Sequence, residues 1–100
     1  MKFVSNYKEF DRRQKESLLD YVSEIAIPQK DIVLSYMKKG EDLGVRCSSV
    51  YDYVKKESTG KTIHCYTDGE FEWDDKEIYH FEHYNLKLDD EFLQKVLRSE

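Results

Sequence analysis

Histidine and cysteine are the residues of this sequence with the most specific chemistry, because their side chains bind metal ions and serve as nucleophiles and bases. The chain holds five of them: Cys47, His64, Cys65, His80 and His83. His80 and His83 are three residues apart, so on one helix they could share a zinc ion. A structural zinc site takes four ligands, and the remaining three residues lack the short paired spacing of such sites.

A nucleophilic pair of cysteine and histidine is also poorly supported. Neighbouring residues of a strand point to opposite faces, so His64 could not readily activate Cys65. We therefore expect no metal, no cofactor and no catalytic residue. In this interpretation both cysteines are small buried apolar side chains and the histidines lie at the surface. A small hydrolase or metal-dependent enzyme that uses His80, His83 or Cys65 stays open as an alternative.

Carboxylates are the most abundant reactive groups. The chain carries 21 acidic and 16 basic residues, a net charge of −5, and residues 51–100 hold thirteen of the acids against seven bases. Residues 68–91 hold ten acids and two lysines, and aromatic residues are interleaved with them. This balance argues against a protein that binds nucleic acid by neutralising phosphates, and it favours a basic protein partner. No P-loop and no Gly-x-Gly-x-x-Gly motif occurs.

We predict a partner-binding surface in the acidic stretch, in which the acids pair with basic side chains and a tyrosine is a partly buried anchor. The predicted contact residues are Asp68, Glu70, Glu72, Asp74, Asp75, Glu77, Tyr79 and Glu82. The competing interpretation is that many of these acids only cap helices, and that Phe71, Trp73, Ile78 and Phe81 form the core.

A tight turn at Asp68-Gly69 predicts a β-hairpin between residues 62–66 and 71–73. Its expected register places Tyr66 opposite Phe71 and His64 opposite Trp73. One face of the hairpin is then aromatic, and we expect this face to pack on helices, because an isolated hairpin is marginally stable.

Apolar spacing of three and four residues predicts helices elsewhere. We expect one from about residue 7 to 25, a second that begins near Pro28 and ends before Gly40, a third from its cap at Asp74 to Tyr84, and a last one capped by Asp89. Residues 41–47 should be a loop and residues 55–61 an exposed turn. Residues 48–56 fit a strand or a helix, and we favour the helix.

The length of 100 residues fits one domain with one core. The expected fold is a single α+β domain over residues 1–100, mostly helical, with one β-hairpin packed against several helices. Two cysteines are too few for a disulfide framework, and no apolar run is long enough for a signal core or a membrane span. We expect a mature protein that stays in the cytoplasm and contacts neither a membrane nor nucleic acid.

The second half of the chain resembles small immunity proteins of bacterial contact-dependent inhibition and other polymorphic toxin systems. The similar segments lie within residues 48–97 and are Thr67-Asp68-Gly69-Glu70-Phe71-Glu72-Trp73, Ile78-Tyr79-His80-Phe81 and Tyr84-Asn85-Leu86-Lys87-Leu88-Asp89-Asp90-Glu91-Phe92. The resemblance implies a non-enzymatic inhibitor that binds a toxin domain stoichiometrically and occludes it. The acidic second half independently suits a basic nuclease toxin. The alternative in the same class is an acidic adaptor or nucleic-acid mimic of phage or plasmid origin.

Overall fold

Strands and helices occupy nearly equal parts of residues 2–98, which are the residues that the computed structural model describes. Their bounds are β1 Lys2–Phe3, η1 Leu18–Asp20, α1 Lys30–Lys38, β2 Glu41–Asp52, β3 Glu57–Thr67, β4 Phe71–Asp74, α2 Asp75–Tyr84 and α3 Asp90–Arg98, where η1 is a 3-10 helix. About 30% of the residues lie in strands and about 32% in helices. The fold is therefore α+β, and the expectation that it is mostly helical is wrong.

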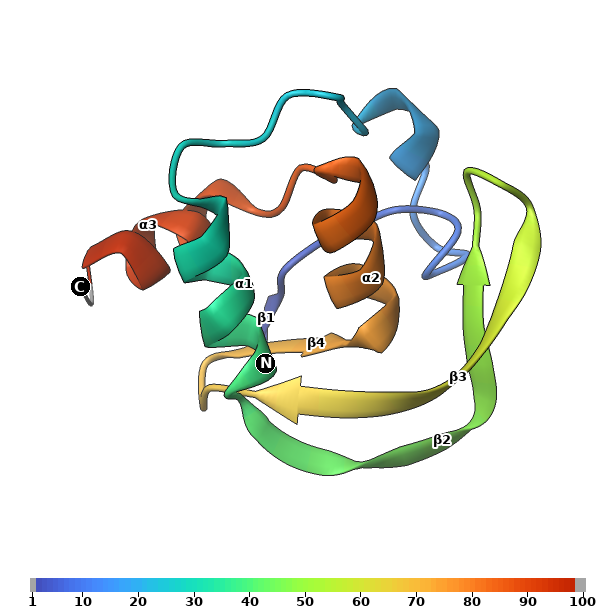
Figure 1. Ribbon diagram of the computed structural model, residues 1–100. Helices are drawn as coiled ribbons and strands as arrows, with labels where there is room; N and C mark the ends of the chain where they lie inside the picture. Colours follow the sequence, from blue (N-terminus) through green and yellow to red (C-terminus); the bar gives the residue numbers. More distant parts are fainter. Residues whose placement is uncertain (1, 99–100) are drawn as a thin grey trace.

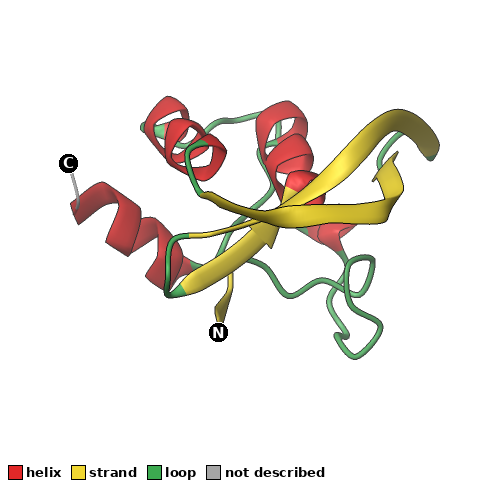
Figure 2. Ribbon diagram, turned by 90° about the horizontal axis from the view of Figure 1, so that it is seen from below, coloured by secondary structure: helices red, strands yellow, loops and turns green. Residues whose placement is uncertain are grey.

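The four strands form one sheet in the order β1-β4-β3-β2. β1 runs parallel to β4, and the other neighbours are antiparallel. The three α-helices lie on one side of the sheet in Figure 1, and in the view from below in Figure 2 no helix lies in front of the strands. The hairpin of β2 and β3 extends beyond β4 and bends upward beside α2 (Figure 1). We call the sheet face turned away from the α-helices the outer face.

The main correction concerns residues 41–56. The expected loop and helix are the strand β2 followed by a turn at residues 53–56, in which Lys56 has a positive φ of 59°. The expected exposed turn at 55–61 is largely the first part of β3. Local sequence could not show this, because β2 is held by pairing with β3 and by burial of Val50 and Asp52 beside α2.

The predicted N-terminal helix is also wrong, because residues 7–25 contain only the 3-10 helix η1. Side chains take the backbone donors that a helix would use: the Glu9 carboxylate accepts from the amide of Leu18, and Ser17 accepts from the amide of Leu19. The apolar residues of the segment instead fold around a small core of their own with Leu86. The spacing of three and four residues therefore marks side chains that are buried, but the backbone between them is not helical.

The hairpin turn is confirmed, with a shifted register. Gly69 has a φ of 97°, and Gly69 and Glu70 are the two central residues of the turn. Tyr66 consequently lies opposite Trp73 and not opposite Phe71. The shift keeps the same side chains on each face, so the aromatic face packs on the helices as expected. The Trp73 indole donates to the carbonyl of Met37 at 3.0 Å.

The remaining helix predictions are confirmed. α1 ends at Lys38, just before Gly40, although it begins at Lys30 and not at Pro28. α2 begins with the predicted capping box of Asp74 and Glu77 and ends at Asn85 in the left-handed conformation. Asp89 caps α3 by accepting from the amide of Phe92. No helix within residues 2–98 is long and apolar enough to cross a membrane.

Candidate functional site

The histidines and cysteines do not converge. Within residues 2–98, no group of three or more histidine, cysteine or acidic side chains is placed to hold a metal ion. Cys65 is buried as expected, but Cys47 is exposed, which corrects the prediction for that residue. Cys65 accepts a hydrogen bond from Nε of Arg46 at 2.9 Å, and His64 contacts Asp42 instead of the adjacent thiol.

His80 is fully buried, which corrects its predicted place at the surface. Its Nε2 accepts from the amide of Tyr53 at 3.2 Å, so the proton sits on Nδ1, which donates to the carbonyl of Lys76 at 2.7 Å. Burial lowers the pKa of His80. Both ring nitrogens are therefore used to join the hairpin to α2, and the imidazole is neutral.

Tyr79, the predicted anchor for a partner, has an internal role. Its hydroxyl donates to the buried carboxylate of Asp52 at 2.6 Å, as does the hydroxyl of Tyr84. Burial alone would raise the pKa of Asp52, but hydrogen bonds from the amide of Lys55 and from the two tyrosines outweigh it and lower the pKa to about 2. This carboxylate fixes the tip of the β2–β3 hairpin to α2.

Four of the predicted contact acids also hold the fold together. Asp68 accepts from Tyr36 at 2.6 Å and from Lys95 at 2.9 Å, while Asp75 accepts from the amide of His64 at 2.7 Å. Asp74 and Glu77 are buried at the start of α2. Charge reversal at any of these positions would disturb folding before it tested binding.

Glu77 is the most perturbed titratable group of the set. Its carboxyl accepts from the amide of Asp74 at 3.2 Å and from the Ser5 hydroxyl. Burial, together with the charge of Asp74, raises the pKa of Glu77 to about 8. The group lines a cavity of about 220 Å³ between the N-terminal segment and the sheet, where Arg13, Arg46 and Lys76 are the basic residues.

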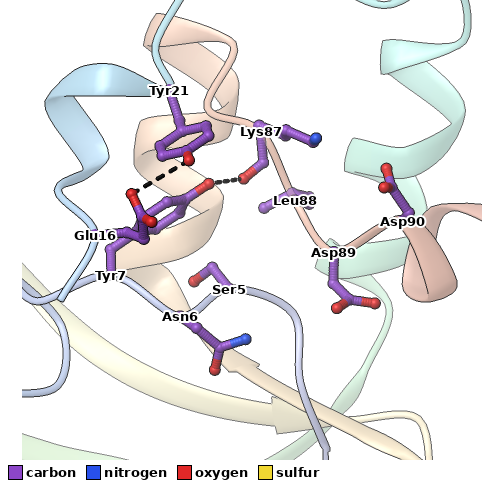
Figure 3. Close-up of a pocket in the computed structure, with 9 residues that line it drawn as sticks. All are labelled: Ser5, Asn6, Tyr7, Glu16, Tyr21, Lys87, Leu88, Asp89 and Asp90. Carbon is purple, nitrogen blue, oxygen red and sulfur yellow. Dashed lines mark hydrogen bonds between the residues drawn. The ribbon is translucent and has the colours of Figure 1, made fainter. Parts of the chain in front are cut away.

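A second, more open pocket of about 250 Å³ lies between the N-terminal segment and the α2–α3 linker. Figure 3 shows the Tyr7 hydroxyl donating to the carbonyl of Lys87 and the Tyr21 hydroxyl donating to Glu16. These contacts lie at the edge of the small second core around Leu86, and Leu88 is one of the residues that line the pocket. The pocket lacks a nucleophile and base pair among the residues that line it, and its hydrogen bonds serve folding.

The other three predicted acids, Glu70, Glu72 and Glu82, are half-buried or exposed at the surface. Glu70 forms ion pairs with the exposed Lys2 and the half-buried Lys95, and Glu82 forms one with Lys38 at 3.4 Å. Glu72 is half-buried, and its charge is one of the causes that raise the pKa of Arg46. It lies on the outer face, since Trp73, the next residue, points toward the helices.

Phe3 is the surface residue that sequence reasoning missed. It pairs with Glu72 across β1 and β4, so both side chains share the outer face, and Phe3 is 48% exposed. We define Phe3, Glu70 and Glu72 as the outer acidic patch. A two-residue strand that pairs with a segment almost seventy residues away leaves no local signal by which it could have been found.

Comparisons with protein-family models, curated proteins and solved structures found no match.

Proposed function

We propose that this chain is a cytoplasmic immunity protein that neutralises a basic nuclease toxin domain by stoichiometric binding and occlusion, without catalysis. The observation that carries the proposal is the outer acidic patch, where an exposed aromatic side chain lies beside carboxylates on a sheet face without α-helices. Aromatic anchors supply much of the binding energy in protein interfaces, and complementary charge speeds the encounter.

The patch is free to exchange its partners. Glu70 is exposed in its ion pairs with Lys2 and Lys95, and solvent screens such pairs, so each contributes little to stability. Arginines of a partner could replace those lysines as partners of Glu70 at small cost. The patch also retains two of the eight residues predicted from the sequence, Glu70 and Glu72.

The test is co-expression with the toxin domain encoded immediately upstream of the gene, scored first by survival of the cells and then by complex formation in gel filtration. We expect the wild-type chain to rescue growth and to form a one-to-one complex. Phe3→Ala and Glu72→Lys should each weaken binding by about tenfold to a hundredfold.

The matched control is Glu24→Lys, which makes the same charge change at an exposed residue in the loop before α1. It should rescue growth as well as the wild type does. Killing of cells that carry the wild-type chain would remove the proposal. Full rescue and unchanged affinity in both patch variants would place the interface on another surface.

A further inference from the structure

β2 is a twelve-residue edge strand of the sheet, so the backbone groups along one of its sides have no strand to pair with. β2 ends the strand order, and none of the described elements pairs with its outer edge. All residues from Glu41 to Ser49 are exposed, and the apolar side chains of Leu43 and Val45 are 50% and 59% exposed. Long exposed edges of this kind readily accept another strand.

The backbone of β2 presents hydrogen-bonding groups to that edge. Opposite residues of an antiparallel pair either exchange both backbone hydrogen bonds or turn both pairs of groups away from each other. His64 donates its amide to Asp75, on the side away from β2, so the opposing Val45 turns its N–H and C=O to the open edge. Tyr66 lies two residues after His64, so its backbone N–H and C=O also point away from β2. Its partner Asp42 therefore also turns its N–H and C=O to the open edge.

A β-bulge sets which side chains share a face. The register steps from Asp42 opposite Tyr66 to Gly44 opposite Cys65, so Leu43 is the extra residue. Glu41 and Arg46 consequently both lie on the outer face, whereas residues five apart in a regular strand lie on opposite faces. Asp42 and Val45 share the other face by the same count.

These features make the segment from Glu41 to Arg46 complementary to itself. In an antiparallel arrangement, Asp42 of one copy exchanges backbone hydrogen bonds with Val45 of the other, and Glu41 then lies directly opposite Arg46. The ion pair forms twice, once on each side of the symmetry axis, and Leu43 of both copies meets at the axis. The outward-facing backbone groups fit this register, and it is the register that places Glu41 opposite Arg46.

We propose that two copies of this chain associate through antiparallel pairing of their β2 edges, about a twofold axis between Leu43 and Gly44. The product is one continuous eight-stranded sheet. Six residues from each copy make a small contact, below the area of a permanent interface, so the dimer forms at high protein concentration. This inference does not rest on the proposed function.

The test uses the purified chain alone. Its molar mass is measured by light scattering or sedimentation from micromolar to near-millimolar concentration. We expect the mass to rise from 12.0 kDa toward twice that value. Glu41→Arg sets two arginines against each other at both ends of the contact, and it should weaken dimerisation by about tenfold.

The charge swap makes the test specific. The double variant E41R/R46E recreates the two ion pairs in reverse and should restore dimerisation, while Glu24→Arg, in the loop before α1, should leave it unchanged. Arg46 also donates to Cys65, so near-ultraviolet circular dichroism of each variant verifies the native packing.

A second variant examines the backbone. Val45→Pro removes an N–H that β3 does not use, so the monomer should keep its fold and lose the dimer. A constant mass of 12.0 kDa for the wild type at every concentration overturns the proposal and leaves the edge to a strand from a different protein. A dimer that survives E41R, or a loss that the swap does not reverse, overturns it as well.

Discussion

Glu77 completes the helix cap of α2, but its carboxyl is buried beside a second carboxyl, that of Asp74. The cap uses the carboxyl as a hydrogen-bond acceptor, whereas burial and the neighbouring charge disfavour its ionised form. With its pKa raised from the usual 4.5 to about 8, the folded chain keeps a proton that the unfolded chain has released. The folded state binds more protons in this window, so the free energy of unfolding should fall as pH rises between those values, by up to about 1.4 kcal/mol for each pH unit. Urea titrations at a series of pH values measure this slope.

Glu77→Gln should reduce the slope, because its amide does not titrate. Its oxygen can still accept from the amide of Asp74, and its NH2 group can donate to the Ser5 hydroxyl. The exposed Glu24→Gln should retain it. Equal slopes in the wild type and in Glu77→Gln would assign the pH dependence to other groups. The sequence predicted the capping box from its spacing. The hydrogen bond between Glu77 and Ser5 joins residues seventy-two apart, and no local pattern contains that contact.

At the scale of elements, Gly40 follows the end of α1 at a position where the side chain of Trp73 leaves no room for a larger residue. A Cβ at Gly40 would lie 2.7 Å from Cζ2 of Trp73 and 3.1 Å from Cβ of Tyr66. The indole cannot yield easily, because it is buried and bonded to the carbonyl of Met37. Gly40→Ala should therefore lower the free energy of unfolding by about 1–3 kcal/mol, as measured by urea denaturation.

Ser35→Ala, on the exposed side of the same helix, is the control for Gly40→Ala, and it should change stability by less than about 0.5 kcal/mol. Similar effects of the two substitutions would show that the indole moves aside.

The elements that could be predicted from the sequence are those whose ends are marked by capping or turn residues nearby in the chain. α2 has its capping box and Asn85, α1 ends before Gly40, and the β3–β4 hairpin contains Gly69. β1 exists through pairing with β4, almost seventy residues away. β2 pairs with β3 across the turn at residues 53–56, which holds no glycine to mark a hairpin, so the sequence of β2 alone did not identify it. The same distinction holds at the candidate site, where local sequence identified Glu72 but could not place Phe3 beside it.

At the scale of the whole molecule, the net charge of −5 acts on a partner before any contact forms. If the partner is a basic toxin domain, the field should speed association at low salt, and screening should slow it as ionic strength rises. Stopped-flow association rates with the purified toxin domain should fall by about tenfold or more from low to physiological ionic strength.

The outer acidic patch should account for a large part of that salt dependence, because charges near the contact steer the final approach most strongly. Glu72→Lys should therefore flatten the dependence of the association rate on ionic strength, whereas Glu24→Lys, with the same net charge, should flatten it less. Phe3→Ala leaves the field unchanged, so it should raise the dissociation rate and leave the association rate alone. Equal flattening by both lysine variants would mean that steering comes from the net charge, and the patch would then lose its electrostatic role.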